Sequence, residues 1–228
     1  MAAVPLRWHR RSQFPHPELD DKSGRGTLFG LSTKERAFLC HRLLQDARLF
    51  GVLKRFDEDM AARVHASRCP VCGGRLDVSN YSRKPRGGPP GHDLRLSFCC
   101  SVEGCRRRAT PPSVRFLARK VYLGAVVVLC TAMQQGLSSC RVRRLREDLG
   151  VSYRTLCRWQ FFWTEAFATS PFWRSAQGRL ARPIAPNRLP VDLLEAMGWA
   201  TDEEESLKRL LRFIAPITTR PHLCSRAN

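Results

Sequence analysis

Apolar residues recur at helical spacing in two segments near the start of the chain. The first segment opens with a capping residue, Ser32 or Thr33, and carries Glu35 in its first turn. The second covers residues 50–67. Their apolar positions are Ala37, Leu39, Leu43, Leu44 and Ala47 in the first, and Val52, Leu53, Phe56, Met60 and Val64 in the second. We expect two helices that pair as a helical hairpin over residues 31–67.

Residues 68–120 follow a different pattern. Strand-like stretches from Arg75 to Val78 and from Arg95 to Cys99 flank a segment rich in glycine, proline and polar residues. This pattern predicts a β-hairpin with a long tip.

The segment from Val121 to Met133 is apolar almost all round and too long for a single strand. It predicts a central buried helix. The run of three valines from Val126 to Val128 leaves a strand open as the alternative, because periodicity alone does not separate the two.

Two short helices joined by a glycine turn are predicted next. Their apolar residues are Val142, Leu145 and Leu149 in the first, and Leu156 and Trp159 in the second. Gly150 ends the first helix, Val151 fills the turn, and Ser152 can cap the second. These offsets are typical of a helix-turn-helix, which we place within residues 121–169.

The two ends of the chain differ in character. Residues 1–30 mix proline and glycine with charges, which predicts a flexible basic arm. We expect residues 170–228 to form a helical tail, with helices over 189–197 and 202–215 whose acidic first turns suit the helix dipole.

Charge changes this picture by suggesting a partner. Among 228 residues, 39 Lys and Arg against 20 Asp and Glu give a formal net charge of +19, which favours a polyanion such as nucleic acid. An acidic membrane surface is the competing partner, but we find no long uncharged apolar run and expect no membrane contact. The first twenty residues lack the apolar core of a secretory signal, so we expect a cytoplasmic protein.

In that reducing compartment, cysteines are more often metal ligands than disulfides.

Four of the ten cysteines have the spacing of a structural zinc site. Cys69 and Cys72 are separated by two residues and followed by a glycine, and Cys100 and Cys105 supply a second pair. We expect one structural Zn²⁺ held by these four thiolates. Cys99 is the substitute for Cys100, which we favour because Cys100 shares a strand face with Phe98.

Other interpretations of the cysteines fit the sequence less well. A buried-thiol core does not require two pairs that each carry a glycine, and a redox Cys-x-x-Cys would open a helix. Four thiolates leave no open position for catalytic water, and we expect His65 and His92 to be surface histidines. Cys40, Cys130 and Cys157 lie in helical apolar patterns and are expected in the core.

The candidate DNA contacts are basic or lie at the start of the second helix of the helix-turn-helix. They are Arg106, Arg107, Arg108, Arg141, Arg144, Ser152, Tyr153, Arg154 and Arg158. Arg154 and Arg158 lie four apart, on the face we expect to enter the major groove, where arginine pairs with guanine or holds phosphate. The alternative is an ordinary helical hairpin with solvated charges.

Three stretches follow one another between Arg68 and Phe167. In order, they are CPVCGGRL, FCCSVEGCRRRATPPSVRFL and LREDLGVSYRTLCRW. In order and spacing they resemble the N-terminal zinc ribbon and helix-turn-helix of insertion-sequence transposases. The resemblance implies binding to transposon-end DNA. In those transposases a ribonuclease-H-like nuclease domain with three metal-binding carboxylates follows, and residues 170–228 do not match it.

The fold class we expect is mainly α with a small β zinc ribbon. Its parts are the arm (1–30), the helical hairpin (31–67), the zinc ribbon and basic linker (68–120), the helix-turn-helix (121–169) and the helical tail (170–228). We expect a non-catalytic, transposase-related protein that binds duplex DNA. The alternatives are a transcriptional regulator, a DNA-binding subunit whose transposase or recombinase partner is a separate chain, and an RNA-binding ribbon. The oligomeric state is not fixed by the sequence.

Overall fold

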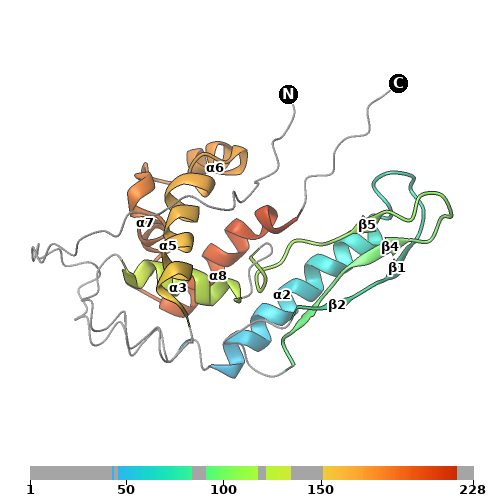
Figure 1. Cartoon of the computed structure of the whole chain (residues 1–228), viewed down its shortest axis with the longest axis horizontal. Helices are drawn as coiled ribbons and strands as arrows, with labels where there is room; N and C mark the ends of the chain where they lie inside the picture. The colour runs from blue at the N-terminus through green and yellow to red at the C-terminus, as the bar shows by residue number, and fades with distance from the viewer. Residues whose placement is uncertain (1–42, 44–45, 84–90, 118–121, 135–150, 220–228) are drawn as a thin grey trace, which may run out of the picture.

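A helical body lies near the start of one long helix, α2, and a slender β ribbon runs alongside that helix to its far end (Figure 1). This computed structural model describes residues 43, 46–83, 91–117, 122–134 and 151–219. The fold is mainly α with small antiparallel sheets, which confirms the expected fold class. Within the described residues, no helix is both long and apolar enough to cross a membrane.

Helix α2 (Ala47–Ala66) belongs to both parts of the molecule. The Asp46 side chain caps it by accepting a hydrogen bond from the N–H of Arg48. Leu49 and Leu53, near its start, are buried in the core of the body. Ala61, near its end, is buried in the separate small core of the ribbon. The predicted second helix is therefore confirmed, but it begins at Ala47, so the last residues assigned to the first predicted helix belong to α2, and the rest of that first helix lies almost entirely outside the described residues.

The ribbon is an antiparallel hairpin extended by a third strand. Strands β1 (Leu76–Val78), β4 (Phe98–Cys100) and β5 (Arg108–Ala109) form one sheet in the order β1-β4-β5. Strands β2 (Tyr81–Ser82) and β3 (Leu94–Arg95) form a two-stranded sheet.

The predicted hairpin is present, but its second arm is broken in two. Where a single strand was expected from Arg95 to Cys99, β3 and β4 are separated at Leu96 and Ser97. The interruption is stabilised locally, because the Asn80 side chain accepts a hydrogen bond from the Ser97 N–H and the Ser97 carbonyl accepts one from Ser79.

The inner face of the three-stranded sheet packs against α2. Leu76 pairs with Cys100 and Phe98 with Ala109, and all four are buried with Ala61. This core contains few large side chains, so the ribbon buries little apolar surface of its own.

The helical body is built around α3 (Gly124–Gln134). The other elements of the body are α5 (Tyr153–Phe161), a π-helical turn (Phe162–Phe167), α6 (Pro171–Ala176), α7 (Val191–Ala196) and α8 (Glu203–Ile214). Three 3₁₀ turns, at Gln177–Arg179, Pro186–Arg188 and Ala215–Thr218, complete it.

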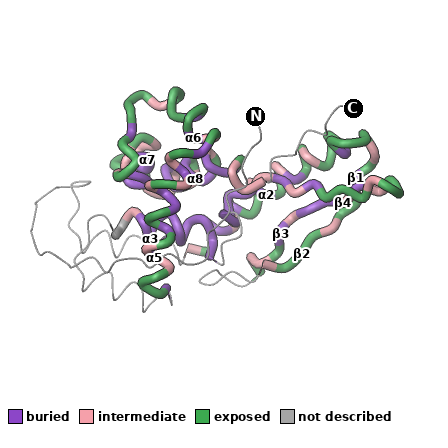
Figure 2. Tube along the Cα trace, turned by 45° about the horizontal axis from the view of Figure 1, so that its top comes forward, coloured by how far each residue is buried: buried purple, intermediate pink, exposed green. Residues whose placement is uncertain are grey.

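Helix α3 is buried from Gly124 to Thr131 and partly buried at Ala132, and Figure 2 shows it as a mostly buried segment. The central helix predicted from this apolar segment is confirmed, and the strand alternative is wrong. Cys130 lies in this core, as expected, and burial raises the pKa of its thiol to about 12. After α5, Phe162, Trp163, Phe167 and Trp173 are buried in this core and Phe172 packs against it, whereas Phe161, the last residue of α5, is 47% exposed.

A buried polar junction ties the ribbon to the body. The Asp57 carboxylate of α2 accepts hydrogen bonds from the Arg115 guanidinium, the Ser113 hydroxyl and the Val114 N–H. Arg115 also donates to the Leu94 carbonyl of β3, and its own carbonyl accepts from the N–H of Gly124 at the start of α3. One carboxylate thus fixes the chain that leads from the ribbon into the body.

Candidate metal centre and nucleic-acid interface

Four thiols converge at the end of the ribbon that lies farthest from the body. The sulfur atoms of Cys69, Cys72, Cys100 and Cys105 all lie within 4.8 Å of one another. The closest pairs are Cys72 with Cys100, at 3.4 Å, and Cys69 with Cys105, at 3.7 Å. A tetrahedral ion with metal–sulfur bonds of about 2.3 Å holds its ligands about 3.8 Å apart, so this cluster has the dimensions of a single metal site.

The first cysteine pair sits on a tight backbone turn. The Gly73 N–H donates to the Cys69 carbonyl, and the Cys69 N–H donates to the Gly74 carbonyl, both at 2.9 Å. Gly73 adopts a φ of +69°, in the left-handed region that side chains disfavour. This geometry lets the chain reverse so that both sulfurs point to one place, and it explains the glycine after Cys72.

The second cysteine pair also lies on a backbone turn with a left-handed glycine, but its loop is longer. The N–H groups of Cys105 and Arg106 both donate to the Val102 carbonyl, and Gly104 has a φ of +82°. Arg106 itself has a φ of +41°, a conformation that costs a side-chain-bearing residue free energy. The Cys100 N–H donates to the Arg107 carbonyl and closes the loop onto β4.

The structure groups Cys100, and not Cys99, with the other three thiols. Cys100 points to the inner face of the sheet and is fully buried, as the alternation of β4 predicts. Cys99 points to the outer face, where its thiol donates to the Arg106 carbonyl at 3.4 Å. It therefore contacts the second loop without facing the cluster.

The three thiols with shifted pKa values differ in how readily they ionise. For Cys69, burial opposes ionisation, but the N–H groups of Val71 and Cys72 donate to the sulfur and lower its pKa to about 7. Burial raises the pKa of Cys100 to about 12. The pKa of Cys105 is also raised: the Arg107 N–H favours its thiolate, but contact with Cys72 and burial outweigh that effect. A bound cation would favour the thiolate form of all of them.

The two candidate histidines are used elsewhere. His65 Nε2 lies 2.9 Å from the Leu76 carbonyl, and its ring packs on Phe98 with centroids 5.0 Å apart. His92 packs edge-on against Phe50, and burial lowers its pKa. Neither histidine belongs to the cluster, whose donors are all sulfur.

Helix α5 is present where the second helix of the helix-turn-helix was predicted. The Ser152 side chain caps it by accepting from the Thr155 N–H, and Leu156 and Trp159 anchor it in the core. Arg154 and Arg158 are exposed on the opposite side. Tyr153 is 40% exposed. The predicted first helix of the motif, with Arg141 and Arg144, lies outside the described residues.

Arg106, Arg107 and Arg108 are exposed at the end of the ribbon. Arg108 is held in place: its Nη1 group donates to the Ser79 carbonyl and to the Ser97 hydroxyl, each at 3.0 Å. Its guanidinium carbon lies 5.6 Å from the centre of the Tyr81 ring. Sequence reasoning did not single out Tyr81, because a lone tyrosine in a polar hairpin gives no signal without the register that brings Arg108 to it.

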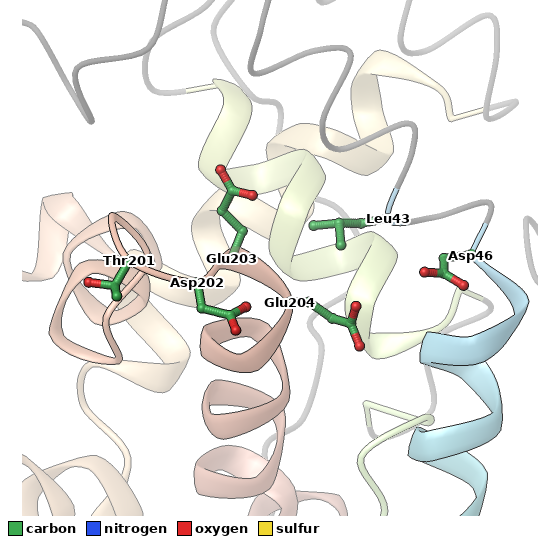
Figure 3. Close-up of a pocket in the computed structure, with 6 residues that line it drawn as sticks. All are labelled: Leu43, Asp46, Thr201, Asp202, Glu203 and Glu204. Carbon is green, nitrogen blue, oxygen red and sulfur yellow. The ribbon is translucent and has the colours of Figure 1, made fainter.

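The acidic residues near the start of α8 gather around a pocket of about 340 Å³ (Figure 3). It is lined by Leu43, Asp46, Thr201, Asp202, Glu203 and Glu204. Asp46 and Asp202 each cap a helix by accepting a backbone N–H, and Glu204 pairs with Lys208 at 2.9 Å. Three of these four carboxylates therefore already stabilise helix ends, as the sequence pattern of α8 suggested.

The buried ion pair of Asp57 and Arg115 was missed by sequence reasoning. A signal exists, because Asp57 lies four residues after Leu53 and four before Ala61, in the stripe of α2 that faces the interior. A charged residue inside an apolar stripe indicates a buried partner.

Comparison with protein-family models, with curated proteins and with solved structures finds no match to this chain.

Proposed function

We propose that this chain is a zinc-stabilised DNA-binding protein, related to transposases and without catalytic activity of its own. The observation that carries the proposal is the pairing of a closed four-thiol site with a capped helix, α5, that exposes two arginines. The remaining support comes from charge and from the sequence resemblance described above.

Zinc is the metal that best suits the cluster. Four sulfur donors at tetrahedral spacing favour Zn²⁺ over hard cations such as Mg²⁺ or Ca²⁺, which prefer oxygen ligands. All four positions are taken by protein, so the ion would serve folding rather than activate water. The ribbon core is small, and metal binding would supply stability that its apolar contacts do not.

Duplex DNA is the partner we propose for α5. Its apolar side is anchored by Leu156 and Trp159, so Arg154 and Arg158 project from a rigid helix. Two arginines one turn apart suit guanine edges or successive phosphates in the major groove. The net charge of +19 would strengthen and accelerate the encounter with DNA.

The absence of catalytic activity is part of the proposal. The carboxylates around the pocket at α8 act chiefly as helix caps and ion-pair partners, roles that account for their positions without chemistry. A role as the DNA-binding subunit of a two-chain transposase, or as a transcriptional regulator, is compatible with the same α5 contacts.

The test is a selection of bound duplexes from random-sequence DNA by the zinc-loaded protein. We expect one enriched motif, and we expect the double variant Arg154→Ala/Arg158→Ala to lose it. A matched control, Arg174→Ala/Arg179→Ala, removes two exposed arginines of the same body outside α5 and should keep the motif. Binding without an enriched motif, or enrichment that survives in the α5 variant, would contradict the proposal.

A further inference from the structure

The outer face of the ribbon sheet, turned away from α2, carries a row of polar side chains across its three strands. Asp77 of β1 pairs in register with Cys99 of β4, which pairs with Arg108 of β5. These residues alternate with the buried side chains that pack on α2. Asp77 and Arg108 are exposed and Cys99 is half-buried, so this face is open to solvent.

Tyr81, in β2 of the two-stranded sheet, forms a fixed pair with Arg108 of this face. The two hydrogen bonds from Nη1 of Arg108 to Ser79 and Ser97 hold the guanidinium beside the tyrosine ring, 5.6 Å from its centre. The ring itself is 36% exposed. Among the described residues, no acceptor is found for the Nε and Nη2 groups of Arg108, which remain available to an anion.

The surroundings of this pair are positively charged. Tyr81 lies directly across the strand from Arg95, which is only 3% exposed and donates to the Pro111 carbonyl. Arg106 and Arg107 are exposed at the adjoining end of β5. The acidic residue of the row, Asp77, is already paired with Arg75 at 3.1 Å. An exposed aromatic ring within a cluster of arginines matches a ligand that combines flat apolar rings with phosphates.

We propose that this outer face binds unpaired nucleotides that extend from the duplex held by α5, with Tyr81 stacking on a base and Arg108 holding the adjacent phosphate. The inference rests on the proposed function, because it adds a second contact to the same DNA. Paired bases are already stacked and offer no open ring face at such a surface, whereas an unpaired base does. Stacking is tolerant of sequence, so this face would contribute affinity for a strand end or gap without reading it.

The test measures fluorescence anisotropy with three labelled probes at one salt concentration: a blunt duplex, the same duplex with a short single-stranded overhang, and an oligothymidine of about twelve nucleotides. The variants are Tyr81→Ala and Tyr81→Phe, which retains the ring. Val78→Ala serves as the matched control, since Val78 is exposed on the neighbouring strand and is 68% accessible. Bound metal and circular dichroism are compared first, so that only folded variants are scored.

We expect Tyr81→Ala to weaken binding of the oligothymidine, and of the overhang relative to the blunt duplex, by about 5- to 100-fold, the usual effect of losing one stacked base. Tyr81→Phe and Val78→Ala should bind like the wild type. Equal binding by Tyr81→Ala, or the same loss on the blunt duplex, would overturn the inference. Tighter binding of the matching RNA oligomer than of the DNA would also overturn the assignment to a DNA overhang.

The two proposals fail separately. If Arg154→Ala/Arg158→Ala weakens binding to the blunt duplex but retains oligothymidine affinity, and Tyr81→Ala weakens oligothymidine binding, both hold. If this variant leaves duplex binding unchanged, the role of α5 is refuted, and the Tyr81 dependence of oligothymidine binding still decides whether the ribbon face binds single strands.

Discussion

The Asp57 carboxylate and the Arg115 guanidinium form an ion pair in the interior of the protein, with Oδ2 2.8 Å from Nε and side chains only 1% and 2% exposed. Asp57 belongs to α2, and Arg115 to the segment that leads from β5 to α3. The pair therefore joins the two cores of the molecule through two charges that are both buried and desolvated.

Removing one partner of this pair should be strongly destabilising. We expect Asp57→Ala to lower the free energy of unfolding by about 3–5 kcal/mol, because Arg115 stays buried without its countercharge. Denaturant titration followed by circular dichroism measures the change. The control is Glu58→Ala, which breaks an exposed pair with Lys54 at 3.8 Å and should cost less than about 1 kcal/mol. Similar losses in both variants would show that the buried pair has no special role.

Metal binding should depend on Cys72 and not on Cys99. We expect elemental analysis of the wild-type protein to find one zinc per chain. Cys72→Ser should lose the metal and unfold the ribbon, because a structural ion contributes directly to folding. Cys99→Ser removes an equally sized thiol from the outer face and should keep both metal and fold. Loss of zinc from Cys99→Ser instead would mean that the ligand set differs from the clustered four.

A substitution at Arg106 should change DNA affinity without lowering the stability of the protein. Its backbone has a φ of +41°, so Arg106→Gly should leave the melting temperature unchanged or raise it, as glycine adopts this conformation without strain. The same substitution should weaken duplex binding and reduce its salt dependence by about one phosphate contact. The control is Arg107→Gly, at the next position, which removes the same charge but relieves no strain from a left-handed backbone conformation. A fall in melting temperature for Arg106→Gly as large as for Arg107→Gly would contradict this account.

Gly124 is expected to tolerate no side chain. A Cβ atom there would lie 3.0 Å from the Val114 carbonyl oxygen and 3.2 Å from the Leu211 side chain. We expect Gly124→Ala to destabilise the protein by about 1–3 kcal/mol through overpacking between α3 and α8. Gly178→Ala is the matched control, since its Cβ would meet no atom within 4 Å, and it should be neutral or slightly stabilising. Thermal unfolding of the two variants gives the comparison.

The long amphipathic elements could be predicted from sequence because their apolar spacing is unambiguous. Each of three patterns correctly predicted a helix. They are the apolar face around Leu53 for α2, the core positions Leu156 and Trp159 for α5, and the acidic first turn for α8. The convergence of the cysteines followed from their spacing and glycines, and the alternation of Phe98 and Cys100 selected the inward-facing thiol.

The features that sequence reasoning missed depend on contacts between distant segments. Asp57 and Arg115 are 58 positions apart, and although the apolar stripe of α2 indicates that Asp57 is buried, nothing near it in sequence identifies Arg115 as its partner. The break between β3 and β4 depends on a hydrogen bond that the Asn80 side chain accepts from the Ser97 N–H. The left-handed backbone of Arg106 depends on the closing of the second cysteine loop. Local propensity contains none of this information.

Helix α2 also fixes the distance between the two cores. Its twenty residues span about 30 Å, close to one turn of B-form DNA, and its two ends are anchored in different cores. The DNA contacts proposed for α5 and for the ribbon would therefore be held at a constant separation and phase. On a target that engages both, adding about five base pairs between the two contacted elements would rotate one to the far side of the double helix, so the spacing of a binding site would be as strictly constrained as its sequence.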